Sequence, residues 1–462
     1  MAAPISLISR VKMFLSVLSL VIFFGSGQAF AAQVVPSGDL AKKVDRYMRA
    51  CVQEGNFSGT VLMARKGKIL ISKGYGLANS EVNARNSSAT IFRLGSITKQ
   101  FTALAIMQLQ ERKRLSVQDP LSKYIPDYPQ GDKITIHHLL THTAGIPNFT
   151  DFPEYSAYMV NPSPVLKTID LFKNRPLDFT PGEKFKYSNS GYIILSYVIE
   201  KASGQSYESF VAENIFQPLN MKNSGYDHHA IILKNRASGY ILTDEGLLNA
   251  PYIDMSIPSG GGALFSTVGD MYLWDRALYK EGLVSRESLD AMFTPYKESY
   301  GYGWIIANLN GRKIITHNGS VNGFLTHIAR YVNDDACIVI LSNIENSPVN
   351  EISSDLKAIL FGEKYEIPRV HKTVSIDRAI YDAYVGQYEV NPKLIISVTK
   401  ERDCLFLQGT DQPRIRLYPE STMNFFMKVV AGEVTFVKDE KGEVIQLVIR
   451  QYGRNTQAKR LR

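Results

Sequence analysis

The 462-residue sequence is poor in cysteine and lacks the usual signals of metal, nucleic-acid and repeat proteins. Its three cysteines, Cys51, Cys337 and Cys404, are far apart and show no C-x-x-C spacing, so neither a metal site nor a disulfide framework is predicted. They allow at most one bridge, and Cys337 lies in an apolar strand pattern that favours a buried thiol. No zinc-finger, RNP-like or helix-turn-helix pattern supports nucleic-acid binding. The formal net charge of +8 is spread along the chain, as on an ordinary solvated surface.

An apolar run as long as a membrane span is missing from the N-terminal region. Arg10 and Lys12 precede the 12 residues "MFLSVLSLVIFF", and a small-residue site with Ala29 and Ala31 follows. This order is typical of a secretory signal peptide, whereas a transmembrane helix needs about 20 apolar residues. We therefore predict that residues 1–31 are removed, that the protein is exported to the periplasm or the extracellular space, and that it has no permanent membrane anchor.

Two regions of different character follow the signal. Residues 33–365 have strand patterns at both ends and helical patterns between them, which predicts an α+β domain with an antiparallel sheet flanked by helices and a helical region. Residues 366–377 are expected to be a linker. Residues 378–462 contain short alternating strands such as "LIISVTK" and "VIQLVIR", which predict a small C-terminal all-β barrel or sandwich.

The stretch "FRLGSITKQF", residues 92–101, places Ser96 three residues before Lys99 at the start of an apolar helix pattern. A serine hydroxyl becomes a nucleophile when a neighbouring base takes its proton, and burial favours an uncharged lysine. The alternative is a helix-capping serine followed by a solvated lysine. The same spacing recurs at Ser354 and Lys357, so the pattern alone does not decide.

Two further motifs favour the catalytic interpretation. Tyr187-Ser188-Asn189 stands before an apolar helix, and "HNGS" (317–320) ends a strand pattern. Together with Ser96-x-x-Lys99, these resemble the active-site motifs of the serine β-lactamase and penicillin-binding-protein superfamily. The Tyr-x-Asn form is similar to class C β-lactamases and the related D,D-peptidases, D-aminopeptidases and esterases. Flanking segments such as "LLTHTAGIP" agree, and the resemblance covers roughly residues 40–360.

This resemblance implies a role for each residue. Ser96 would form an acyl-enzyme, while Lys99 and Tyr187 would remove and return its proton, with the principal base left open. Asn189 would bind Lys99 and the substrate amide, and the backbone N–H groups of Ser96 and Ser320 would hold the oxyanion.

Gly319 would let the strand approach the substrate closely. His317 stands where the family commonly has a lysine that helps to recognise a substrate carboxylate. Because an unperturbed imidazole titrates near pH 6.5, we expect any such recognition by His317 to fade as the pH rises from about 6 to 8.

His138 and His142 have the i, i+4 spacing of metal ligands, but the glutamate of H-E-x-x-H is absent. We predict no metal and no organic cofactor. The sequence thus predicts an exported serine hydrolase that cleaves an amide or ester bond through a Ser96 acyl-enzyme, on small D-amino-acid peptides or β-lactam-like compounds, with cell-wall peptidoglycan as a candidate partner. A promiscuous carboxylesterase and a non-catalytic β-lactam or wall-binding protein stay open as alternatives.

Overall fold

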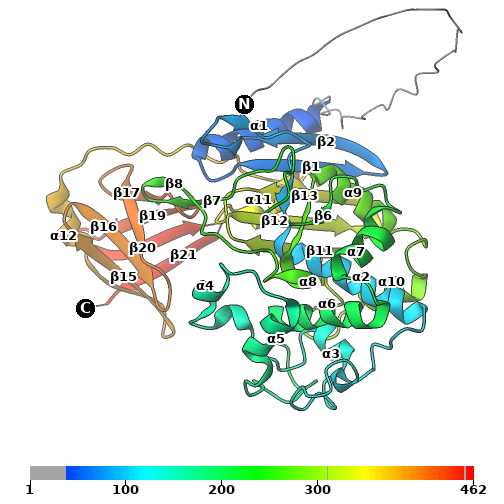
Figure 1. Ribbon diagram of the computed structural model, residues 1–462. Coiled ribbons are helices and arrows are strands. Elements are labelled where there is room, and N and C mark those ends of the chain that lie inside the picture. Colours follow the sequence, from blue (N-terminus) through cyan, green and yellow to red (C-terminus); the bar gives the residue numbers. More distant parts are fainter. Residues whose placement is uncertain (1–37, 310, 452–453, 462) are drawn as a thin grey trace, which may run out of the picture.

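The computed structural model describes residues 38–309, 311–451 and 454–461 (Figure 1). The predicted signal peptide, residues 1–31, lies outside these ranges. Within them, a domain of mixed helices and strands stands beside a closed barrel formed by the C-terminal part of the chain. No helix of the described part is long and apolar enough to span a bilayer.

A six-stranded antiparallel sheet forms the centre of the larger domain, in the order β10-β11-β12-β13-β1-β2. Its strands are β1 (Gly59–Arg65), β2 (Lys68–Tyr75), β10 (Ile305–Leu309), β11 (Arg312–Val321), β12 (Phe324–Tyr331) and β13 (Ala336–Ser342). The N-terminal hairpin joins the C-terminal strands because β1 pairs with β13, from Gly59 opposite Ser342 to Arg65 opposite Ala336. The predicted α+β class, with a sheet that unites both ends of the domain, is confirmed.

Helices cover both faces of this sheet, which explains why β13 reads "ACIVILS" and is buried at every position. The α-helices of this domain are α1 (Asp39–Glu54), α2 (Thr98–Glu111), α3 (Ile136–Leu140), α4 (Tyr155–Tyr158), α5 (Val165–Lys173), α6 (Asn189–Ser203), α7 (Tyr207–Val211), α8 (Ser259–Gly262), α9 (Val268–Ala277), α10 (Arg286–Met292) and α11 (Val349–Phe361). Short strands and turns connect them: β3 (Leu77–Asn79), β4 (Ala84–Arg85), β5 (Phe92–Arg93), β6 (Gly225–Tyr226), β7 (Tyr240–Thr243), β8 (Gly246–Asn249), β9 (Leu264–Ser266), the 3-10 turns η1 (Gly95–Ile97), η2 (Leu121–Lys123), η3 (Phe149–Asp151) and η5 (Val332–Asp334), and the π turn η4 (Ala212–Phe216).

The outer face of the sheet is covered by α1 and α11, which are amphipathic. In α1 the buried residues recur at helical spacing, at Val44, Tyr47, Met48 and Cys51, and they pack with β1 and α11 in one apolar cluster. Cys51 and Cys337 are buried, and all three cysteines carry free thiols.

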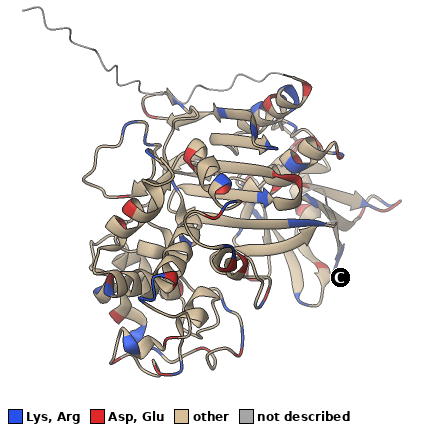
Figure 2. Ribbon diagram, turned by 90° about the vertical axis from the view of Figure 1, so that its right-hand side faces the viewer, with Lys and Arg blue, Asp and Glu red and all other residues tan. Residues whose placement is uncertain are grey.

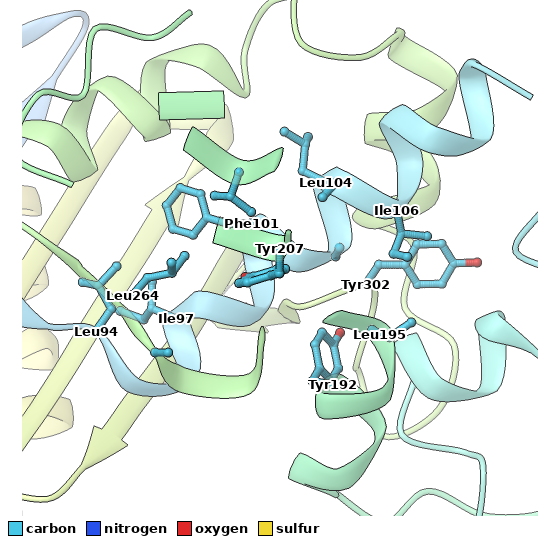
Figure 3. Close-up of a cluster of buried hydrophobic side chains, with 14 of the residues drawn as sticks. Leu94, Ile97, Phe101, Leu104, Ile106, Tyr192, Leu195, Tyr207, Leu264 and Tyr302 are labelled. Atoms are coloured by element: carbon cyan, nitrogen blue, oxygen red, sulfur yellow. The ribbon is translucent and has the colours of Figure 1, made fainter. Parts of the chain in front are cut away.

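The inner face is covered by a larger apolar cluster around α2. This helix is buried on nearly all sides from Thr98 to Leu109, in agreement with its apolar pattern. Figure 3 shows Phe101, Leu104 and Ile106 of α2 among side chains of α6, α7 and β9. Because α2 and α6 share this core, their N-terminal ends are held in a fixed relation to the sheet. Those ends carry two of the predicted motifs.

The C-terminal region forms a closed eight-stranded antiparallel barrel, which confirms the predicted all-β domain. Its strands are β14 (Gly386–Asn391), β15 (Leu394–Glu401), β16 (Cys404–Gly409), β17 (Ile415–Pro419), β18 (Asn424–Met427), β19 (Gly432–Lys438), β20 (Val444–Gln451) and β21 (Arg454–Arg460). They follow η6 (Arg378–Ile380) and α12 (Tyr381–Tyr384). The interior is filled by aromatic side chains, among them Tyr384 stacked on Phe436 with ring centroids 4.1 Å apart. The barrel therefore has its own packed apolar core.

The two domains touch through a few polar contacts. The Tyr418 hydroxyl of the barrel donates to Asp244 at the turn of the β7–β8 hairpin, over 3.1 Å, and Asn346 Nδ2 donates to the Val429 carbonyl over 2.9 Å. In Figure 1 this hairpin extends from the larger domain toward the barrel. In the view of Figure 2, Lys and Arg residues are interspersed with Asp and Glu, so the positive excess does not gather on one face there.

Candidate active site

Ser96 lies in the 3-10 turn η1, immediately before α2 begins at Thr98. The alternative of a helix-capping serine beside a solvated lysine is wrong on both counts. No side-chain capping bond closes the start of η1 or of α2, and Lys99 is 0% exposed inside the large apolar cluster.

The Lys99 ammonium group has three polar neighbours. Nζ lies 2.9 Å from Ser96 Oγ, 2.8 Å from Asn189 Oδ1 and 2.8 Å from the Gly261 carbonyl oxygen. Burial away from water lowers the pKa of Lys99 well below its usual value of 10.5. An amide oxygen and a carbonyl oxygen can only accept hydrogen bonds. Nζ therefore donates to Asn189 and Gly261 as well as to Ser96 Oγ. Because the lowered pKa favours loss of a proton, the amine that forms can keep its bonds to Asn189 and Gly261 and direct its lone pair at the Ser96 hydroxyl.

Tyr187 approaches the same serine from the turn before α6. Its hydroxyl donates to Ser96 Oγ over 2.9 Å, and its ring lies 5.0 Å from Lys99 Nζ. Burial raises the pKa of Tyr187 above its usual value of 10.0, although the bond to Ser96 opposes this shift. The side chain is thus a protonated phenol at neutral pH, able to donate a proton.

Asn189 is held in place by a loop that sequence reasoning did not single out. Its backbone N–H donates to Asn148 Oδ1 over 2.9 Å. The neighbouring Ser190 hydroxyl donates to the Pro147 carbonyl over 2.6 Å and accepts the Phe149 N–H. The run "IPNF", residues 146–149, overlaps the family-like segment "LLTHTAGIP", but by itself its sequence indicates only a proline-containing turn and no bond to Asn189. Its docking on α6 aims the Asn189 amide at Lys99.

A wall of aromatic rings closes the site behind Tyr187. The His142 ring lies 4.2 Å from the Tyr187 ring, and its Nδ1 accepts the Ser188 N–H over 3.2 Å. Burial, Lys99 and His317 all lower the pKa of His142 well below 6.5. The Tyr300 ring lies 4.6 Å from His142. Tyr300 was not predicted as a site residue, because a tyrosine in "SYGYGW" carries no chemical signal by itself.

His317 is not a free substrate ligand in this structure. It is 4% exposed, Nδ1 donates to the Asn318 carbonyl, and Nε2 lies 2.9 Å from the Tyr300 hydroxyl. Since the carbonyl can only accept, the neutral ring carries its proton on Nδ1 and accepts the Tyr300 proton at Nε2. Burial and the nearby Lys99 lower its pKa to about 3. The expectation that His317 titrates near pH 6.5 is therefore wrong, because desolvation disfavours the imidazolium.

Gly319 and Ser320 bring β11 against η1. A Cβ atom on Gly319 would lie 1.9 Å from the Leu94 carbonyl oxygen. The close approach thus serves the packing of two backbone segments, and the approach of Gly319 to a substrate stays a prediction. Gly95, at φ +54°, also lies close to β11, with its own Cβ position 2.7 Å from Ser320 N. These contacts set the backbone amides of Ser96 and Ser320 near each other.

The competing sequence motifs lie elsewhere. Ser354 is exposed on α11, and Lys357 forms an ion pair with Glu363 over 2.8 Å. The Tyr-x-Asn spacing of the second motif also recurs, at residues 331–333, and there Tyr331 packs in the outer-face cluster. Ser96 and Lys99 therefore differ from Ser354 and Lys357 in their tertiary environment, although both pairs have the same spacing.

His138 and His142, the two histidines at i and i+4, make hydrogen bonds that stabilise local structure. His138 Nδ1 accepts the Thr135 N–H over 3.2 Å in a capping box at the start of α3. The His142 Nδ1 contact with Ser188 holds the turn before α6. Within the described ranges, no group of three or more His, Cys, Asp or Glu residues is arranged to hold a metal ion.

Comparisons with known proteins agree with this geometry. Residues 44–360 match the family Beta-lactamase, and residues 370–460 match a domain of unknown function (DUF3471). Penicillin-binding protein 4* of Bacillus subtilis (strain 168) is 32% identical over 418 residues, which cover 84% of this chain and 92% of that protein.

Solved structures show the same fold. The octameric penicillin-binding protein homologue from Pyrococcus abyssi superposes with a TM-score of 0.65 at 28% identity, over 90% of this chain and 99% of that one. A D-stereospecific amidohydrolase from Streptomyces sp. superposes with a TM-score of 0.62 at 22% identity, over 71% of this chain and 100% of that one. The second likeness concerns the fold alone.

Proposed function

The chain belongs to the beta-lactamase family of serine hydrolases, and from this premise we propose that it is an exported enzyme that cleaves an amide or ester bond through a Ser96 acyl-enzyme. The observation that carries the proposal is the 2.9 Å contact between Lys99 Nζ and Ser96 Oγ inside a buried site. A lysine with a lowered pKa can take the serine proton at neutral pH, as nucleophilic catalysis by serine requires.

Lys99 is the principal base in this proposal. As Ser96 Oγ attacks the carbonyl carbon, its proton passes to the Lys99 lone pair, while Asn189 and Gly261 hold the other two N–H groups. A phenolate base is disfavoured because burial keeps Tyr187 protonated.

Tyr187 instead returns a proton. Its hydroxyl touches Ser96 Oγ, so it can donate to the leaving nitrogen or oxygen and be reprotonated from Lys99. The carbon–nitrogen or carbon–oxygen bond then breaks and the acyl group stays on Ser96. Water later releases the acid by the reverse proton transfers.

The backbone amides of Ser96 and Ser320 supply the oxyanion site. Negative charge develops on the carbonyl oxygen in the transition state, and fixed N–H donors stabilise it without reorganisation. The close packing of Gly95 on Ser320 supports this assignment, because it holds the two amides at one place.

We assign D-amino-acid peptides, or the β-lactams that resemble them, as the substrate class. The assignment is supported by the likeness to penicillin-binding protein 4* and by the predicted export. A simple carboxylesterase would hydrolyse a nitrophenyl ester but leave a D-Ala-D-Ala peptide intact, and a binding protein would be acylated without turnover. A panel of these two substrates and a penicillin separates the three.

The decisive experiment is covalent labelling. Intact-protein mass spectrometry after exposure to a penicillin or a fluorophosphonate is expected to show one adduct that maps to Ser96. The adduct disappears in Ser96→Ala and persists in Ser354→Ala, a matched control with the same Ser-x-x-Lys spacing. Labelling that is unchanged in Ser96→Ala would refute the proposal.

Export is tested at the N-terminus. N-terminal sequencing of protein from the native host should return a residue close to Ala32, in a fraction outside the cytoplasm. Recovery of Met1 would contradict signal cleavage.

A further inference from the structure

A second concave region lies beside the predicted nucleophile. It is a cavity of about 340 Å³ between β5, the start of β12 and the loops that carry Arg236 and Tyr252. Arg93 on its wall precedes Ser96 by three residues, and Asn322 follows Ser320 by two. Because a chain spans at most about 3.6 Å per residue, the Cα atoms of Arg93 and Ser96 are within about 11 Å of each other.

The wall of this cavity carries more positive than negative charge. Arg93 Nε lies 2.7 Å from one carboxylate oxygen of Asp227, and Arg236 Nη2 lies 2.6 Å from the other. Asp227 is 1% exposed, whereas the two arginine side chains are 18% and 29% exposed. One guanidinium would neutralise Asp227, so the second leaves one positive charge on the wall.

Further carboxylates lie outside the residues that line the cavity. Glu345 accepts the Gly323 N–H over 2.8 Å. Asp254 accepts hydrogen bonds from Tyr252 and Ser256, and the exposed Glu81 accepts one from Asn249. Both are engaged at the solvent side, where charges are strongly screened. On the cavity wall, the Arg93 guanidinium lies 5.9 Å from the centroid of the Phe324 ring.

The strand geometry directs a bound substrate toward this cavity. β10 pairs with β11 only as far as Thr316, opposite Ile305. A substrate lying along the next stretch of that edge would pass Ser320, with one half toward His317 and the other toward Asn322. The His317 end holds a neutral, fully bonded imidazole. The Asn322 end leads to the arginines, and the Asn322 amide donates to the Pro251 carbonyl on the cavity wall over 3.0 Å.

We propose that this cavity is a subsite for a carboxylate on the acyl part of the substrate, with Arg93 and Arg236 as its cationic ligands. The inference rests on the proposed function, since it concerns the substrate that Ser96 attacks. Planar guanidinium groups suit a carboxylate because they bind both of its oxygens at once. The favoured substrates are then acyl groups that end in a carboxylate a few carbons beyond the scissile carbonyl.

The test compares two p-nitrophenyl esters of equal shape, one with a glutaryl group and one in which its free carboxylate is a neutral amide. We expect wild type to prefer the acidic ester by about tenfold in kcat/KM. This preference should disappear in Arg236→Gln and return in large part in Arg236→Lys, which restores the charge. Arg312→Gln is the matched control, because it removes another ion-paired arginine, bound to Asp334 at the far end of β11. It should keep the wild-type preference.

The outcomes separate the subsite from the proposed function. If both esters are hydrolysed through Ser96 and the preference is the same in wild type and Arg236→Gln, the subsite is refuted while the proposed function stands. If neither ester is hydrolysed and no penicillin or fluorophosphonate labels Ser96, the proposed function fails, and calorimetric binding of both esters to Ser96→Ala tests the cavity alone. Tighter binding of the acidic ester that depends on Arg236 supports the subsite, and equal binding overturns it.

Discussion

The hydroxyl of Tyr300 lies 2.9 Å from Nε2 of His317, and this contact occupies the ring nitrogen that could otherwise have met a substrate. The other nitrogen is taken by the Asn318 carbonyl. We therefore predict that carboxylated and neutral substrates show the same pH dependence of kcat/KM between about pH 6 and 8. A decline confined to carboxylated substrates would show that the imidazole is charged when substrate binds.

The burial of His317 should also make the free energy of unfolding depend on pH. The folded protein keeps His317 neutral down to a pKa of about 3, whereas the unfolded chain takes up a proton near pH 6.5. Stability is thus fully present above pH 6.5 and is lost as the pH falls toward 3. In urea unfolding at pH 7 and pH 5, His317→Gln should lose about 2 kcal/mol less than wild type. An equal loss in both proteins would contradict the assignment.

Lys99 is predicted to be indispensable for turnover. Lys99→Met should lower kcat/KM by at least about 100-fold, the usual contribution of a positioned base, while the circular dichroism spectrum stays that of the wild type. Because the neutral amine is the active form, wild-type kcat/KM should rise with pH and level off above the lowered pKa of Lys99. Lys357→Met, in the surface motif, serves as the control and should behave as wild type. Full activity in Lys99→Met would remove this residue from the proton transfer.

Tyr187 should matter most when the leaving group needs a proton. A nitrophenolate leaves without protonation, but the nitrogen of an anilide or peptide does not. Tyr187→Phe is therefore expected to reduce anilide hydrolysis by about 100-fold and nitrophenyl ester hydrolysis far less. The comparison of kcat/KM for an ester and an anilide with the same acyl group checks this. Equal losses on both would argue against proton donation by Tyr187.

Gly319 is predicted to be required by packing. In Gly319→Ala the new methyl would lie 1.9 Å from the Leu94 carbonyl and 2.4 Å from Thr326 Oγ1, so one of the two backbone segments must move. We expect a loss of about 2 kcal/mol or more in the free energy of unfolding, together with loss of activity. Gly282→Ala is the control, since nothing lies within 4 Å of its Cβ position. A Gly319→Ala variant as stable as wild type would show that η1 and β11 are not closely coupled.

The larger domain should fold without the barrel. The apolar clusters of the two parts share no residue, and a cut after residue 368 keeps Tyr365, which packs on Tyr47 of α1 with ring centroids 6.3 Å apart. Protein ending at residue 368 is expected to be soluble, to unfold cooperatively and to hydrolyse a neutral nitrophenyl ester. An insoluble or inactive truncation would show that the barrel and the larger domain form one cooperative unit.

Much of the fold could be predicted because local patterns and tertiary structure agree. The Val-, Leu- and Ile-rich pattern around Lys66 and Gly67 predicts a hairpin, and the sequence from residue 311 to 343 predicts three strands. Both appear with nearly these bounds, as does the buried helix after "FRLGS". In the C-terminal domain, alternation predicts six strands, in "LIISVTK", "CLFLQG", "RIRLYPE", "NFFMKVV", "VTFVKD" and "VIQLVIR", which correspond to β15–β20, and it misses β14 and β21. These two strands pair with each other, Tyr388 opposite Arg460, and turn a set of strands into a closed barrel. Closure depends on a pairing between distant segments, which alternation within a strand does not encode.

For the site residues too, local motifs predicted which side chains matter, and the tertiary structure decided how they are arranged. Ser96, Lys99, Tyr187 and Asn189 were chosen from short motifs, and the structure joins them through hydrogen bonds; their catalytic roles stay predictions. The sequence by itself determined the predicted class of chemistry, which is nucleophilic catalysis by a serine. Ser96, Lys99 and Tyr187 stand in ordered motifs, and together they supply a nucleophile and the groups that move its proton. Only the tertiary structure decided the charge of each group. Desolvation depends on everything packed around a side chain, so Lys99 loses its proton easily and His317 stays neutral, whereas Lys357, in an identical spacing, keeps its ion pair at the surface.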